Sequence, residues 1–366
     1  MTAVVTGLGA VSSLGRGVDA FYRRLRAGDS AIRPFLPEEH PGIEAEGLAR
    51  VDGWTPQPEI PAGKARRMDR GSQFAVVASL EAVRDANYPL EERRERLGIA
   101  LGTGSAGSGA LTEFIRVLFV ESPEAAPPFH FPNTIANGPA SQVSLELKFL
   151  GPNATITQKD PSALNAAIYA AGCLEDGRAD AMLAGGVDEW NAVYSLAMGQ
   201  MRALRGPRMR SGIVQGEGCY VALLETEEGA RARGARIRAR LAGFGFAGSP
   251  SPPYAYAPDA GAAERAMRDA LDRAGWEASS VDLVLATRNG RTEMDEIECR
   301  VLDRLFGGRI PETIALKGQI GEMAAAGGAQ IVAACRRFAE DGGPRRALVN
   351  SFGAGGNFIS LVLERG

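Results

Sequence analysis

The stretch that decides the fold is Ala154-Thr-Ile-Thr-Gln-Lys-Asp-Pro-Ser-Ala-Leu-Asn-Ala-Ala-Ile-Tyr-Ala-Ala-Gly-Cys-Leu-Glu175. It predicts a strand over 154–158, a polar turn, and a mostly apolar helix over 161–175. The same order returns around Glu322, where the predicted helix covers 323–340. A buried strand that leads into small residues follows each helix, as Leu183-Ala-Gly-Gly and as Val349-Asn-Ser-Phe-Gly-Ala-Gly-Gly. The repetition indicates an internal duplication.

Strands and helices also alternate on both sides of these two units. Predicted strands cover 97–101, 181–184, 219–225, 236–246, 281–286, 347–350 and 358–364, and predicted helices include 69–87, 110–120 and 260–274. Such alternation implies parallel sheets with helices on their faces. We therefore expect an α/β protein with two duplicated halves in a five-layer αβαβα sandwich. Residues 1–230, with interface insertions, would form the first half, and residues 231–366 the second.

The composition excludes several classes of function. The 366 residues carry 41 Lys and Arg against 44 Asp and Glu, a net charge of -3, which gives no electrostatic reason to expect nucleic acid or an anionic membrane as partner. The four cysteines form no CxxC pair, and the histidines are only His40 and His130, so we expect no metal site. No signal peptide or membrane-spanning run is recognisable, and we expect a cytoplasmic protein.

Two local motifs have ordinary structural interpretations. Gly102-x-Gly104-x-x-Gly107 matches a dinucleotide-binding spacing, but the segment after the next helix is rich in proline, so we predict a tight turn and no nucleotide cofactor. Asp160-Pro161-Ser162 has the composition of a helix start, because Asp is a favoured N-cap and Pro is favoured at the first helical position. We expect Asp160 to be ionised and to cap its helix.

Several ordered segments together resemble a β-ketoacyl-acyl-carrier-protein synthase, a condensing enzyme with the thiolase fold. They span nearly the whole chain and are Val4-Val-Thr-Gly-Leu-Gly-Ala-Val-Ser-Ser-Leu-Gly15, Pro132-Asn-Thr-Ile-Ala-Asn137, Leu150-Gly-Pro152, Asp180-Ala-Met-Leu-Ala-Gly-Gly186, Gly216-Glu-Gly218, Ala257-Pro258 and Asn350-Ser-Phe-Gly-Ala-Gly-Gly356. The resemblance implies two duplicated α/β halves, in agreement with the repeat.

The resemblance also implies a catalytic Cys-His-His set, and this chain departs from it at all three positions. Asp160 occupies the place of the nucleophilic cysteine, and Asn289 and Glu322 occupy those of the two histidines. The family's lysine is retained as Lys317, which we expect to pair with Asp160. Ala354 stands where a phenylalanine usually gates the pocket. The carboxylate at 160 has little nucleophilicity toward a thioester.

Three changes of different chemistry within a retained scaffold resemble a chain-length factor, the ketosynthase β subunit of type II polyketide synthases. The resemblance implies no cofactor, a heterodimer with an active Cys-His-His ketosynthase, and an acyl carrier protein as further partner. It favours aryl-polyene or highly reducing polyene systems. Residues that would line the acyl tunnel at the interface are Phe114, Leu118, Phe129 and Phe131. Two alternatives remain: a decarboxylase with Asp160 or Glu322 as base, and a homodimeric carrier-protein-binding module.

Overall fold

The structure is a computed structural model that describes residues 3–36, 38, 40–126, 128–253, 255–256 and 260–366, and for Phe129 only the backbone. Two sheets of five strands share one strand order and join edge to edge. In the N-terminal sheet the order is β6 (Asn153–Ile156), β5 (Leu97–Gly102), β7 (Ala181–Asp188), β9 (Gly218–Thr226) and β1 (Ala3–Ser12). In the C-terminal sheet it is β12 (Glu312–Ile314), β11 (Leu283–Leu285), β13 (Arg346–Gly353), β14 (Asn357–Arg365) and β10 (Ala239–Gly248).

The strand directions repeat as well as the order. In each half the two outermost pairs are parallel, as β5 is with β6 and with β7, and the remaining pairs are antiparallel. The halves meet through a short antiparallel pairing in which Val4 and Val5 of β1 face Arg240 and Ala239 of β10. The duplication predicted from the sequence is therefore present in the topology. The predicted division at residue 230 falls within the short helix α9 (Glu227–Ala232) and stays a prediction.

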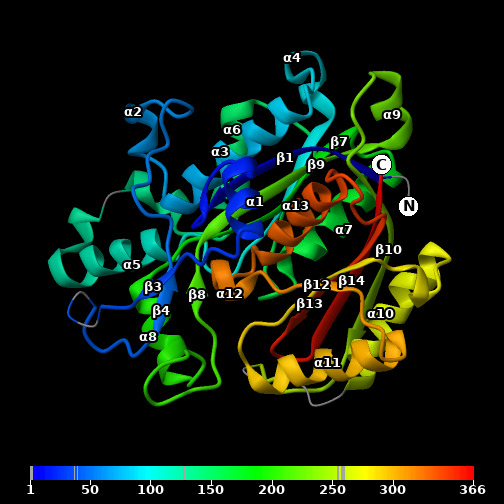
Figure 1. The fold of residues 1–366 in the computed structure, drawn as a ribbon. Coiled ribbons are helices and arrows are strands. Elements are labelled where there is room, and N and C mark those ends of the chain that lie inside the picture. Colours follow the sequence, from blue (N-terminus) through cyan, green and yellow to red (C-terminus); the bar gives the residue numbers. More distant parts are fainter. Residues whose placement is uncertain (1–2, 37, 39, 127, 254, 257–259) are drawn as a thin grey trace.

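Helices cover both sheets and fill the space between them (Figure 1). The central layer is α7 (Ser162–Glu175) with α13 (Ala326–Phe338). One outer layer has α3 (Arg70–Asp85) and α6 (Gly138–Leu147), and the other has α10 (Ala260–Ala274) and α11 (Thr292–Phe306). These layers form the expected αβαβα sandwich of the thiolase fold, and the fold-class prediction is confirmed.

The remaining elements are short and peripheral. The helices are α1 (Val18–Arg26), α2 (Ala62–Ala65), α4 (Leu90–Arg93), η1 (Arg94–Arg96), α5 (Ser108–Arg116), η2 (Val117–Glu121), η3 (Pro123–Ala125), η4 (Pro128–Asn133), α8 (Ala192–Gln200), η5 (Ala278–Ser280) and α12 (Lys317–Ile320). The strands are β2 (Gly15–Arg16), β3 (Ile32–Pro34), β4 (Gly47–Ala49) and β8 (Gln215–Gly216). The predicted helix 110–120 thus begins earlier, as α5, and continues into the π-helical turn η2.

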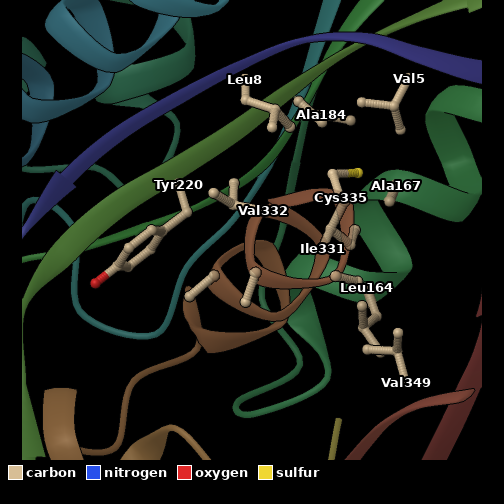
Figure 2. Packing of buried hydrophobic residues seen from close by; sticks show 14 of the residues in the cluster. Val5, Leu8, Leu164, Ala167, Ala184, Tyr220, Ile331, Val332, Cys335 and Val349 are labelled. Carbon is tan, nitrogen blue, oxygen red and sulfur yellow. The ribbon is translucent and has the colours of Figure 1, made fainter. Parts of the chain in front are cut away.

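Small residues let the central helices approach the sheets closely. A Cβ on Gly102 of β5 would lie 2.3 Å from the carbonyl carbon of Ser162 in α7, and one on Gly186 of β7 would lie 2.7 Å from Cα of Ala325. Larger side chains at these positions would push the helices off the sheet. Figure 2 shows the resulting packing, with Leu164 of α7 and Val332 of α13 among the side chains between the sheets. This dense central layer fixes where the N-termini of α7 and α13 point.

The part of the chain that the structure describes has no membrane-spanning helix and no cluster of metal-ligating side chains. None of its described helices is both long enough and apolar enough to cross a bilayer. Likewise, the described residues contain no group of three or more His, Cys, Asp or Glu side chains arranged to hold a metal ion.

Candidate functional site

A pocket of about 370 Å³ lies where the start of α7 meets the loop before α13. Its floor carries four carboxyl groups, those of Asp160, Asp188, Glu189 and Glu322. Much of its wall is apolar, and the apolar side chains include Met198, Met201, Ile213 and Met323. The two histidines, His40 and His130, are not among the lining residues. The pocket is therefore apolar in its walls and acidic at its floor.

Asp160 lies in the turn between β6 and α7 and is only 8% exposed. Its backbone carbonyl accepts a hydrogen bond from Oγ of Ser351, at 2.8 Å. The expectation that its side chain caps the helix is wrong, because the N-cap residue of α7 is Pro161 and no side-chain cap is formed. Ser162 holds the turn instead, since its Oγ donates to the carbonyl of Lys159 at 2.6 Å and accepts from the amide of Gln158 at 2.8 Å. The carboxylate of Asp160 is left to line the pocket.

Lys317 pairs with Glu322, and the predicted pairing of Lys317 with Asp160 is replaced by this contact. Nζ of Lys317 lies 2.9 Å from Oε1 of Glu322, and the two side chains are 2% and 6% exposed. The angles fall outside those of a regular hydrogen bond, so the contact is an ion pair. The pairing follows from the chain itself, because α12 begins at Lys317 and ends at Ile320, two residues before Glu322.

Charges in this buried group influence one another strongly. Burial, reinforced by the negative charge of Asp160, raises the pKa of Glu322 well above its usual value, although Lys317 opposes the shift. Burial acts to lower the pKa of Lys317, but the attraction of Glu322 and Asp160 outweighs it, so the net direction is upward. Burial and the charge of Asp160 therefore favour the protonated form of Glu322, and the attraction of Lys317 opposes them.

Asn289 is held by the framework of the neighbouring helix α11. The backbone amide of Asn289 donates to Oδ1 of Asp295 at 3.0 Å. The backbone amide of Thr287 donates to Oε1 of Glu298, also at 3.0 Å. Nδ2 of Asn289 donates to the hydroxyl of Tyr256 at 2.7 Å. Burial first, and then Asp160 and Glu322, raise the pKa of Tyr256 well above its usual value. The side chain at 289 is thus directed at a pocket-lining phenol, but an amide cannot exchange a proton in this pH range.

The glycine-rich segment after β5 binds a carboxylate of the protein itself. The amides of Gly104 and Ser105 donate to Oδ1 of Asp188 at 2.7 and 2.8 Å, and Oγ1 of Thr103 does so at 3.0 Å. The other oxygen of Asp188 accepts from the amide of Ala325, next to α13. The predicted tight turn is present, and its amides are occupied by Asp188.

Glu189 connects the pocket with the starts of two helices. Its carboxylate accepts from the amides of Gly71 in α3, at 3.0 Å, and Gly109 in α5, at 2.9 Å. Asp69, the N-cap of α3, lies in the same buried region. Burial and the charge of Asp69 raise the pKa of Glu189 to about 7. Glu189 was not predicted from the sequence, although an acidic residue directly after a buried strand is a usable signal.

The predicted tunnel residues lie outside this pocket. Phe114 and Leu118 are half-buried on α5 and η2, and Phe131 on η4 is 57% exposed. The rings of Phe114 and Phe131 meet edge to face, with centroids 5.6 Å apart. The side chain of Phe129 lies outside the described residues. Of the predicted site residues, Asp160, Glu322 and Ala354 line the pocket, and Lys317 and Asn289 contact residues that line it.

Several apolar side chains on α5, on η2 and in the segment 131–135 are exposed, and together we call them the α5 surface. Its members are Leu111, Ile115, Phe119, Val120, Phe131 and Ile135. Phe119 and Val120 are 80% and 73% exposed. Figure 1 shows α5 projecting at one side of the molecule. A group of large apolar side chains this exposed is typical of a protein contact surface.

The fold is a duplicated thiolase fold, and the start of α7 lies at a pocket with apolar walls and an acidic floor. These two features define the class of acyl-transferring condensing enzymes and their relatives. Comparison with known families agrees: residues 2–230 match the beta-ketoacyl synthase N-terminal domain, and residues 238–344 match the C-terminal domain. The chain belongs to the β-ketoacyl synthase family.

Individual relatives carry different names. Nodulation protein E of Rhizobium sp. (strain N33) is 33% identical over 83% of this chain and 77% of its own length. The 3-oxoacyl-[acyl-carrier-protein] synthase 2 of Staphylococcus aureus is 29% identical over 83% of this chain and 79% of its own length. Among solved structures, the ishigamide ketosynthase/chain length factor superposes with a TM-score of 0.88 at 27% identity, over 100% of this chain and 99% of that one.

Proposed function

We propose that this chain is a chain-length factor, a subunit without condensing activity that pairs with an active Cys-His-His ketosynthase and shapes its acyl tunnel. An acyl carrier protein would deliver the growing polyketide chain, and aryl-polyene or highly reducing polyene systems are the favoured context. The observation that carries the proposal is the replacement of all three catalytic positions within an intact scaffold. Asp160, Asn289 and Glu322 stand in or beside one pocket, where condensation would need a thiolate and two imidazoles.

The replacements remove each step of the condensing chemistry. A carboxylate at Asp160 is a poor nucleophile toward a thioester and would form an anhydride in place of a thioester. Asn289 has no proton to exchange. Glu322 brings a carboxyl group to the place where developing negative charge would need stabilisation, and the neighbouring cation, Lys317, is already paired with it.

The outer face of the chain supports a partner of the same fold. The α5 surface exposes several large apolar side chains, and β6 ends its sheet with one side not paired to another described strand. An unpaired strand edge and an exposed apolar surface each suit contact with a second subunit. The ishigamide protein, similar along the whole chain, is itself named as a ketosynthase with a chain length factor.

Co-expression with an intact ketosynthase from the same gene neighbourhood tests the proposal. We expect a one-to-one complex by native mass measurement, and chain elongation that needs the partner's cysteine. The matched variant D160N should leave elongation by the complex unchanged, since Asp160 performs no step in it. A chain that elongates acyl groups alone, or that forms only homodimers beside the ketosynthase, would contradict the proposal.

One observation favours a second function, malonyl decarboxylation with carboxyl groups as the acid and base. Glu322 holds a proton more tightly than an ordinary carboxyl group and could return it to the carbanion left by loss of CO₂. The purified chain with malonyl-carrier protein should release no CO₂ if the first proposal holds. Release that E322Q abolishes would favour the second.

A further inference from the structure

The rim of the pocket is crossed by a lysine side chain that no catalytic role requires. Lys159 is exposed, whereas its neighbour Asp160 is buried on the pocket floor, so the chain passes from solvent to the interior between these two residues. Lys159, Pro253 and Ala354 all line the pocket, and they come from three segments that are distant in sequence. Pro253 is exposed and Ala354 is partly exposed. These residues therefore form one side of the pocket that is open to solvent, and Tyr194 and Met201 are exposed elsewhere on its wall.

The ammonium group of Lys159 joins the other two segments. Nζ donates to the carbonyl oxygen of Pro253 and, at 3.4 Å, to that of Ala354. The two loops are also joined directly, since the amide of Gly355 donates to the carbonyl of Ala255 at 2.8 Å. A flexible four-carbon side chain is thereby fixed across the opening by contacts at its far end.

The backbone at Lys159 has an unusual conformation. Its φ is 58°, in the left-handed region that few residues other than glycine adopt. Such a conformation costs free energy and persists where the surrounding contacts hold it. The bond from Oγ of Ser162 to the carbonyl of Lys159 provides such a contact.

We propose that Lys159 is a latch that closes this side of the pocket and hinders the approach of acyl groups to Asp160 from there. The far end of the lysine side chain lies against Ala354, where its ammonium group contacts the carbonyl oxygen. In a complex that contains a second, active pocket, the latch directs the substrate to the partner. The latch itself is a property of this chain and stands whether or not the chain is a chain-length factor.

A thiol placed on the pocket floor measures the closure. In D160C the new thiol can be alkylated by N-ethylmaleimide and by a bulky fluorescein maleimide, and the exposed Cys299 serves as internal reference in the same molecule. We expect K159A to raise the rate of labelling by the bulky reagent about tenfold relative to Cys299. Loss of the lysine charge would itself slow labelling, because a nearby cation favours the thiolate, so an increase reports access.

Lys148 provides the matched control, since it is another exposed lysine with a left-handed backbone, at φ 55°, remote from the pocket rim. K148A should leave the labelling ratio unchanged. Equal ratios for K159A and for the unsubstituted lysine in the D160C background would overturn the latch.

Hydrogen exchange provides a second measurement that does not depend on D160C. In the otherwise native chain, K159A should speed exchange in peptides that cover 249–256 and 353–356, because the two loops lose the side-chain contact that joins them in addition to their backbone hydrogen bonds. K148A should not change these peptides. Unchanged exchange in K159A would show that Lys159 does not hold the loops together and would also overturn the proposal.

Discussion

Nζ of Lys317 lies 2.9 Å from Oε1 of Glu322, with both side chains almost completely withdrawn from water. The pair stands beside Asp160 at the floor of a pocket that, in the condensing enzymes this family is named for, performs acyl transfer. Lys317 and Glu322 are engaged with each other, and removal of one partner from a buried pair leaves the other charge without compensation. We therefore expect the Lys317–Glu322 pair to contribute to the stability of the fold.

Removal of the cation should therefore destabilise the fold. We expect K317M to lower the free energy of unfolding by about 3 kcal/mol at pH 8, because it leaves two carboxyl groups buried without a counter-charge. K317M/E322Q should recover at least half of the loss. Urea unfolding measures both, and K148M, at an exposed lysine, should change the free energy by less than about 0.5 kcal/mol. A double variant as unstable as K317M would show that the ion pair is not the cause.

The carboxyl pair Asp69 and Glu189 should make stability depend on pH. The pKa of Glu189 is raised from an ordinary 4.5 to about 7 in the folded chain. The folded state thus binds this proton more tightly than the unfolded state, so the contribution is most favourable below pH 4.5 and is lost as the pH rises through about 7. D69N keeps an N-cap residue on α3 and removes the neighbouring charge.

We expect D69N to raise Tm by about 3 °C at pH 8 and by much less at pH 5. Thermal unfolding at the two pH values measures the difference. D52N, at an exposed aspartate, is the control and should behave the same at both. A gain for D69N of the same size at pH 5 and pH 8 would contradict the shared-charge explanation.

The α5 surface should be required for binding of the partner ketosynthase. F119D places a charge on the most exposed of its aromatic side chains, and we expect affinity for the partner to fall by at least about tenfold. The melting temperature of the isolated chain should not change, since Phe119 is 80% exposed. Ile310, exposed on the loop before β12, gives the control variant I310D, which should bind normally. Analytical ultracentrifugation of the mixture measures both.

Truncation of half-buried side chains behind that surface should lengthen the product. F114A and L118A, co-expressed with the partner, would enlarge a tunnel that the two subunits share, and we expect products longer by at least one extension unit. Mass spectrometry of the products measures the change. L145A, at an exposed leucine of α6, is a volume-matched control for L118A. Unchanged product length in F114A and L118A would remove the tunnel role.

Periodicity and repetition in the sequence were sufficient for the architecture. The strand, turn and helix around Asp160 and around Glu322 predicted the duplication, because alternation of buried strands with apolar helices reflects local burial that each segment carries in its own residues. The sequence likewise predicted that Asp160, Asn289 and Glu322 occupy the positions of the family's catalytic cysteine and histidines, since aligned motifs place these positions by counting along the chain.

Only the tertiary structure decided which groups meet. The sequence predicted that Asp160 caps α7 and pairs with Lys317. In the folded chain no side chain caps α7, and Lys317 pairs with Glu322. Lys159 and Glu189 gained their roles in the same way, through contacts with Pro253 and Gly109 from distant segments. The pattern of side chains in a sequence predicts which face of an element is buried. It does not predict which of several charged side chains lies nearest to a given charge, because that depends on how the central helices approach the sheets in three dimensions.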